Sequence, residues 1–158
     1  MHETLILQLL ILLAVANGTP VIAKLLLGDK FAASLDGGAP FGDGRPWFGP
    51  SKTLRGFVLA VLATTGAAVL LGLGVLVGTM AMAGDLLSSF VKRRLGLAPS
   101  SQAIGLDQIP ESLFPLLAAC LLLPLTALDV TVATMLFFAG GLLLSRLLYK
   151  WHVRDRPY

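Results

Sequence analysis

Residues 56–91 read GFVLAVLATTGAAVLLGLGVLVGTMAMAGDLLSSFV and contain a single charged side chain, Asp85. One helix of this length would extend for about 54 Å, nearly twice the roughly 30 Å thickness of the hydrocarbon core of a bilayer. The run Gly72-Leu73-Gly74 lies near its middle, and paired glycines are typical of a break between helices. The pattern therefore predicts a tight hairpin of two membrane-spanning helices, at about 57–72 and 75–94.

Further apolar runs lie on both sides of this hairpin. Residues 4–23 carry no charged side chain, and residues 112–128 and 130–145 are also free of charge, with Pro124 and Asp129 marking the break between them. We expect three more helices, at about 4–27, 110–126 and 129–149, and two long loops, at about 28–56 and 95–109. The prediction is a single all-α membrane domain over residues 1–158 with five transmembrane helices.

The composition supports a membrane protein. Of the 158 residues, 56% are hydrophobic and 13% are charged, and the mean hydropathy is +0.83. A soluble domain carries about 25% charged residues, so this chain has too few to cover a surface in water. Its one cysteine, Cys120, excludes a disulfide within the chain. Nothing in the sequence indicates a nucleic-acid-binding protein.

The distribution of basic residues predicts the orientation. With five spans, all twelve Lys and Arg residues fall on one side of the membrane, and the other side holds only Glu3 and Asp129. Basic residues collect on the cytoplasmic side of membrane proteins. We therefore expect the N-terminus outside the cell, the C-terminus in the cytoplasm, and both long loops on the cytoplasmic side of the cell membrane.

The first polar segment, residues 36–56, contains six glycines and three prolines, which exclude a regular helix. Glycine-rich backbone can bring its N–H groups close to an anion, and Lys52 and Arg55 add positive charge while Thr53 adds a hydroxyl. The spacing of a P-loop is absent. Two interpretations stay open for this segment alone: a phosphate-binding loop, or a basic loop attracted to anionic lipid headgroups.

The second polar segment lies at the end of the third predicted helix. At about 100° per residue, Asp85, Ser88, Ser89 and Lys92 share one helix face, followed by Arg93. A carboxylate at membrane depth costs about 2.5–3.5 kcal/mol on insertion scales, so Asp85 is expected to face a polar cavity or a metal ion. The alternative is a structural ion pair.

The third polar segment leads into the fourth predicted helix, where Asp107 and Glu111 lie at the entrance. Acids at a helix N-terminus contribute about 0.3–1 kcal/mol, and this capping role is the simpler interpretation. Asp107 would nevertheless share the cytoplasmic side with Asp85, and two carboxylates near basic side chains suit a Mg²⁺–triphosphate site. In the first helix, Asn17 near Pro20 predicts either a kink lining the same cavity or a hydrogen bond between helices.

Together these segments resemble the CDP-archaeol synthase family, which is related to the phosphatidate cytidylyltransferases. The resemblance covers essentially the whole chain. It rests on Ala16-Asn17 with Pro20, Asp43-Gly44-Arg45, Phe48-Gly49, Lys52-Thr53-x-Arg55-Gly56, Gly84-Asp85, Ser89-Phe90-x-Lys92-Arg93-Arg94-Leu95 and Leu106-Asp107-Gln108. One departure is Gly49-Pro50-Ser51-Lys52-Thr53, where many members read Gly-Asp-Gly-Lys-Thr.

The resemblance implies a reaction. A lipid phosphate attacks the α-phosphorus of CTP, pyrophosphate leaves, and a CDP-activated lipid remains, with Mg²⁺ as cofactor. The resemblance also suggests a role for each of the polar residues. Asp85 and Asp107 bind Mg²⁺, Lys92 and Arg93 hold the CTP phosphates, Lys52, Thr53 and Arg55 clamp the nucleotide or the lipid phosphate, and Ser89, Asn17 and Asp43 add polar contacts.

Two other classes of function are compatible with parts of the pattern. A small transporter or ion-coupled carrier would also place Asp85 and Asn17 in a polar cavity between broken helices, but the outer halves of the helices carry no charge for a second gate. A structural subunit bound to anionic lipid would explain the basic residues and not Asp85. The sequence leaves open whether the chain forms a homodimer.

Overall fold

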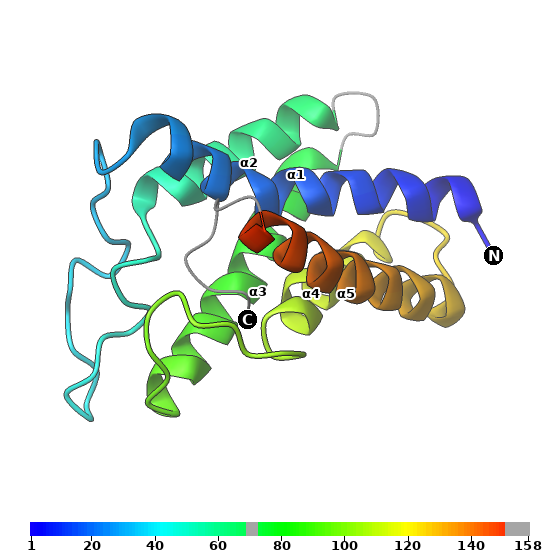
Figure 1. Cartoon of the computed structure of the whole chain (residues 1–158). Helices are drawn as coiled ribbons and strands as arrows, with labels where there is room; N and C mark the ends of the chain where they lie inside the picture. The colour runs from blue at the N-terminus through cyan, green and yellow to red at the C-terminus, as the bar shows by residue number, and fades with distance from the viewer. Residues whose placement is uncertain (69–72, 151–158) are drawn as a thin grey trace.

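The computed structural model describes residues 1–68 and 73–150, with side chains as far as residue 146. Within these residues the chain forms five α-helices and no strand longer than an isolated bridge (Figure 1). The helices are α1 (Glu3–Leu27), α2 (Leu54–Ala67), α3 (Gly74–Arg94), α4 (Gln108–Ala119) and α5 (Ala127–Lys150). The all-helical prediction is confirmed. The predicted last residues of the second helix, 69–72, lie outside the described residues, as does the C-terminal segment 151–158.

Two helix boundaries differ clearly from the predictions. The second helix begins at Leu54, three residues early, because the Thr53 hydroxyl caps it by accepting a hydrogen bond from Gly56 N at 3.1 Å. The fourth helix ends at Ala119 and not near 126. Pro124 explains the early end, since it cannot donate a helical hydrogen bond and disfavours helical backbone before it. The apolar residues that follow Ala119 form turns.

Length and composition make three helices candidates for crossing a membrane: α1, α3 and the Ala127–Arg146 part of α5. The helix α2 is apolar but shorter. Many large apolar side chains on α1 and α5 are exposed, including Leu26 at 79% and Leu143 at 67%. Such an apolar exterior suits contact with lipid.

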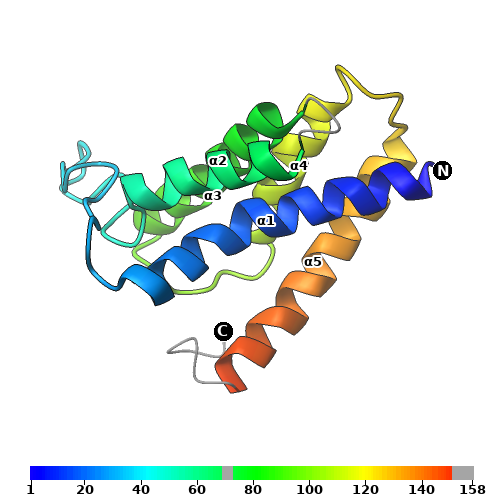
Figure 2. The ribbon, with the colours of Figure 1, turned by 90° about the horizontal axis from the view of Figure 1, so that it is seen from above.

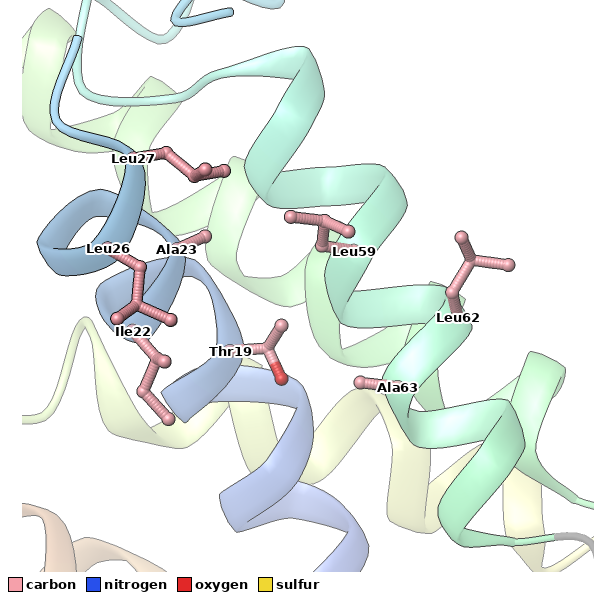
Figure 3. Close-up of a pocket in the computed structure, with 8 residues that line it drawn as sticks. All are labelled: Thr19, Ile22, Ala23, Leu26, Leu27, Leu59, Leu62 and Ala63. Atoms are coloured by element: carbon pink, nitrogen blue, oxygen red, sulfur yellow. The ribbon is translucent and has the colours of Figure 1, made fainter. Parts of the chain in front are cut away.

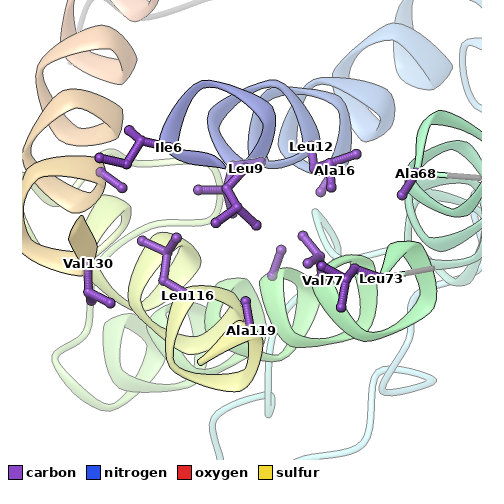
Figure 4. Packing of buried hydrophobic residues seen from close by; sticks show 13 residues of the cluster. Ile6, Leu9, Leu12, Ala16, Ala68, Leu73, Val77, Leu116, Ala119 and Val130 are labelled. Atoms are coloured by element: carbon purple, nitrogen blue, oxygen red, sulfur yellow. The ribbon is translucent and has the colours of Figure 1, made fainter. Parts of the chain in front are cut away.

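The helices pack around a core of aliphatic and small side chains (Figure 4). The helix α1 contacts all four of the others, and α3 packs between α2 and α4. Small residues permit the closest approaches: a Cβ added at Gly78 would lie 3.1 Å from Thr64, and one added at Gly84 would lie 2.2 Å from Pro110 O. Close contact through small residues is typical of helix packing in lipid.

Chain connectivity places the two long loops at one end of the bundle. Residues 28–53 join the end of α1 to the start of α2, and residues 95–107 join the end of α3 to the start of α4. We call this the loop end. At the opposite end, His2 contacts Asp129 through both its backbone nitrogen and its ring Nδ1, each at 2.9 Å. From there α1 and α5 diverge toward the loop end (Figure 2).

Candidate functional site

A cluster of charged side chains lies at the loop end between α3, α4 and the first loop. The Lys52 ammonium contacts both carboxylate oxygens of Asp85, at 2.5 and 2.6 Å. The Glu111 carboxyl group interacts with Asp85 as well. The cluster therefore holds two carboxyl groups in contact and one cation beside them.

The backbone contact between α3 and α4 brings Glu111 to Asp85. Gly84 has no side chain, so the peptide joining Pro110 to Glu111 lies directly against α3, and a Cβ at Gly84 would fall 2.8 Å from Glu111 N. The sequence indicated Glu111 only as a helix-capping acid. Its four-residue spacing from Asp107 was the available signal, because that spacing places both side chains on one face of a helix.

A second ion pair lies two helical turns along α3. Lys92 Nζ is 2.6 Å from Asp107 Oδ1, and both side chains are largely buried, at 9% and 15% exposed. The contact is an ion pair without the alignment of a hydrogen bond, since Asp107 Oδ1 lacks a hydrogen-bond partner in the described structure. The ammonium also donates to Ser101 O at 3.0 Å, and Asp107 Oδ2 accepts from Ala103 N at 2.8 Å. These bonds fix the second loop against α3.

Arg93 presents unused hydrogen-bond donors beside this pair. The residue is 5% exposed, and its Nη2 donates to Ala98 O at 2.9 Å. Its Nε and Nη1 atoms are buried and have no partner among the described residues. Burying a guanidinium with unsatisfied donors is costly. The arrangement suits an anion, which would accept from these N–H groups.

The glycine-rich loop contacts the Arg93 side chain at Gly49. Gly49 is buried, has a φ of +90°, and lies against the Arg93 side chain, where an added Cβ would be 3.5 Å from Cδ. A positive φ is readily adopted only by glycine among common residues. Gly49 thus lets the loop pass over the guanidinium without covering it with a side chain.

One carboxylate organises this loop from within. Asp36 Oδ2 accepts from Phe48 N and Gly49 N, both at 2.9 Å, while Oδ1 accepts from Ser34 Oγ and Gly38 N. Burial alone would raise the pKa of Asp36, but these hydrogen bonds to the ionised form outweigh it and hold the pKa well below its usual value. Asp36 was not among the site residues predicted from the sequence; the Asp-Gly-Gly run, typical of a turn, was its only signal.

Asp43, Arg45 and Arg94 lie at the outer edge of the site. Arg94 Nη1 contacts Asp43 Oδ1 at 2.6 Å, and its guanidinium lies over the rings of Phe41 and Phe90. Arg45 donates to the Arg94 carbonyl at 2.6 Å. These contacts attach the first loop to the end of α3, and they place Asp43 with Arg94 rather than with Asp85.

Of the other residues singled out from the sequence, Asn17, Thr53 and Arg55 have local partners. The Asn17 amide donates to Leu13 O within α1, Thr53 caps α2, and Ser89 is buried on α3. Arg55 donates to Lys30 O and to Gly28 O, which join the start of α2 to the end of α1. The structure thus brings Lys52, Asp85, Lys92, Arg93 and Asp107 together, and it places Asn17, Thr53, Arg55 and Asp43 in separate local contacts.

Two carboxyl groups of this cluster carry the oxygen donors that a magnesium ion prefers. Within the described ranges, no group of three or more His, Cys, Asp or Glu side chains is arranged to hold a metal. Mg²⁺ usually takes one or two carboxylates, with substrate phosphates and water supplying the other ligands. Asp85 and Glu111, already in contact, form such a pair.

Comparison with known proteins assigns the chain to a family. A family model described as CarS-like, CDP-archaeol synthase, matches residues 2–158. The chain belongs to this family. The resemblance that the motifs predicted is therefore confirmed, and the CarS-like assignment counts against a small transporter.

Individual CDP-archaeol synthases support the assignment. The chain is 41% identical over 104 residues to the protein of Hyperthermus butylicus and 37% identical over 130 residues to that of Methanopyrus kandleri. These matches cover 60% and 75% of this chain, and each covers 59% of the relative's own length. A CDP-archaeol synthase of Saccharolobus islandicus is 34% identical over 86% of this chain and 82% of its own length.

A solved structure agrees with the fold. It is described as an intramembrane enzyme for archaeal membrane lipids biosynthesis, and it matches with a TM-score of 0.67 and 28% sequence identity. The match covers 85% of this chain and 90% of that one. Together with the long apolar helices, this likeness identifies the chain as a membrane-embedded protein.

Proposed function

We propose that this chain transfers a cytidylyl group from CTP to a membrane lipid phosphate, with Mg²⁺ as cofactor, at the loop end of the helix bundle. The carrying observation is the buried Arg93 guanidinium with two unpartnered donor atoms, next to the Lys92–Asp107 and Lys52–Asp85 pairs. A buried guanidinium with free N–H donors suits the phosphates of a nucleotide. The relatives are named for their product, CDP-archaeol, and a CDP-activated lipid forms from CTP and the corresponding lipid phosphate.

In the proposed reaction an oxygen of the lipid phosphate forms a bond to the α-phosphorus of CTP, and the bond from that phosphorus to the β-phosphate oxygen breaks. Pyrophosphate carries away the bonding electron pair. The protein's part is to align the two phosphates and stabilise the charge that develops. Arg93 and Lys92 bind the phosphates of CTP, and Lys52 provides a further positive charge beside Asp85.

The carboxyl groups would hold the cofactor and orient the cations. Asp85 and Glu111 would bind Mg²⁺, which supplies charge neutralisation at the phosphates. Asp107, the second ligand predicted from the sequence, is paired with Lys92 in the structure and orients that ammonium. Comparing the Mg²⁺ dependence of Glu111→Gln with that of Asp107→Asn decides between the two carboxylates, since loss of a ligand raises the Mg²⁺ concentration needed for half-maximal activity.

The proposal includes the membrane orientation expected from the sequence. The loop end carries Lys52, Lys92 and Arg93, whereas the opposite end carries Glu3 and Asp129. Five crossings with the N-terminus outside would place the loop end in the cytoplasm, where CTP is available. The lipid phosphate would then reach the same site from the inner leaflet.

The variant Asp85→Asn tests the site. We expect it to lower kcat by about a hundredfold or more, because removing a charge that organises phosphates and metal affects the transition state most. The measurement is lipid-dependent release of pyrophosphate from CTP by purified protein in detergent. Glu3→Gln, the same change at the exposed opposite end, is the control and should retain normal turnover. Full activity of a well-folded Asp85→Asn protein would remove Asp85 from the mechanism.

A further inference from the structure

An apolar groove runs between α1 and α2 on the outside of the bundle. Its cavity volume is about 310 Å³, and Figure 3 shows the side chains from the two helices that line it. The lining residues are Thr19, Ile22, Ala23, Leu26, Leu27, Leu59, Leu62 and Ala63. A volume near 300 Å³ is at the lower end of the range for small-molecule sites.

The chemistry of the groove is that of hydrocarbon. Its one hydroxyl, on Thr19, is already used, since it donates to Val15 O within α1 at 2.6 Å. Leu26 and Leu62 on its rims are more than half exposed, which leaves the groove open to the surrounding lipid. An occupant would find packing surface and no free hydrogen-bonding group.

Positive charge lies at the loop end of the groove. Arg55 precedes Leu59 by four residues and therefore lies one turn above it on the same face of α2. Its guanidinium bridges to the end of α1, and its buried Nε has no partner in the described structure. Lys24 and Lys30 are nearby along the chain, with Asp29 as the only acid between them.

We infer that this groove holds one hydrocarbon chain of the lipid phosphate substrate, with the phosphate lying toward Arg55. The inference rests on the proposed function and separates the basic residues of the site into two groups. Lys52, in the first loop just before α2, points to Asp85, whereas Arg55 in α2 points to the end of α1. The nucleotide and the lipid would thus approach the start of α2 from different sides.

Occupation of the groove should have a modest effect, limited to the use of long-chain lipid substrate. A lipid chain is as apolar in the bilayer as in the groove, so its placement brings no hydrophobic gain and depends on shape and on the charge at the head. Blocking the groove should therefore weaken use of long-chain substrate and leave CTP binding unchanged. A short-chain lipid phosphate, which does not need the groove, should be unaffected.

The variant Ala63→Phe fills the groove, and Ala139→Phe makes the same change on the exposed face of α5 as a matched control. With a long-chain isoprenoid lipid phosphate we expect Ala63→Phe to raise KM by about three- to tenfold, a small effect for an apolar pocket. KM for CTP, and KM for a short-chain analogue, should match wild type. Equal long-chain KM values in Ala63→Phe and Ala139→Phe would overturn the inference.

A binding measurement separates this inference from the proposed function. A long-chain lipid phosphate carrying a photoreactive group in its chain should label peptides of α1 and α2, and an excess of unlabelled lipid phosphate should suppress that labelling. The labelling should fall in Ala63→Phe and persist in Ala139→Phe, whether or not the protein turns over CTP. Labelling restricted to other helices, or suppressed equally by a neutral lipid, would contradict the groove. Absence of pyrophosphate release in wild type would contradict the proposed function instead.

Discussion

Asp36 shows how one side chain can fix a loop that has almost no regular structure. Four donors, three of them backbone N–H groups, converge on its two oxygens, and two of these come from residues that follow it by 12 and 13 positions. Hydrogen bonds to an ionised acceptor are about twice as strong as neutral ones. The position of Gly49 over Arg93 therefore depends on a carboxylate that need not touch substrate.

The variant Asp36→Asn should loosen this loop. Asn keeps only one acceptor oxygen, so one of the two pairs of hydrogen bonds is lost. We expect KM for CTP to rise several-fold while kcat changes less, the pattern of lost binding rather than lost chemistry. Hydrogen exchange of the residue 36–49 amides should increase. Unchanged exchange there would show that other contacts hold the loop.

The lowered pKa of Asp36 also makes the stability of the loop depend on pH. Because the folded-state pKa lies below the unfolded value of about 3.9, ionised Asp36 stabilises the loop fully above that value. The contribution is lost as the pH falls further toward the folded pKa. Wild-type loop exchange should therefore increase below about pH 4, whereas Asp36→Asn should lack that component.

At the level of secondary-structure elements, the contact between α3 and α4 assembles the charged cluster. Because Gly84 has no side chain, the backbone of α4 lies directly against α3 at this position. This close contact places Glu111 against Asp85. Helices held this closely move as one unit. The cluster geometry should then be sensitive to any change in their separation.

Gly84→Ala is the test at this level. Its Cβ would overlap Pro110 O, so α4 must shift, and we expect a loss of roughly 1–3 kcal/mol in stability together with a severe fall in activity. Thermal unfolding in detergent and pyrophosphate release measure the two effects. Gly140→Ala on α5, where an added Cβ meets nothing within 4 Å, is the matched control and should change neither. Normal activity of Gly84→Ala would mean that the separation of α3 and α4 is unimportant.

The elements that were predictable from the sequence are those set by local pattern. Charge-free runs predicted the helices, and the helical period placed Asp85, Ser88 and Lys92 on one face of α3. The pairing of Asp85 with Glu111 was not predictable, because it depends on how closely two helices pack. The bonds of Asp36 were missed for a related reason: they join backbone groups distant in sequence, and no composition signal marks them.

For the molecule as a whole, the five-helix fold agrees with the assigned family. The number of membrane crossings remains a proposal. Three helices are long enough to cross a bilayer by themselves. The remaining two, α2 and α4, lie against α3 on either side and are shorter. The helices therefore differ in length, and α4 is the shortest of those within the described ranges 1–68 and 73–150.

On the proposed five crossings, the early end of α4 would have a mechanical consequence for the surrounding bilayer. Twelve helical residues span about 18 Å, against roughly 30 Å of hydrocarbon, and each ångström of mismatch costs a fraction of a kcal/mol. If α4 is one of the five proposed crossings, lipids beside its outer end would compress or tilt, which would thin the bilayer around the bundle. Turnover in vesicles of short-chain phospholipids should then exceed turnover in thick ones at equal substrate fraction; a flat dependence would contradict this. An enzyme built in this way would respond to the thickness of the membrane whose lipids it helps to make.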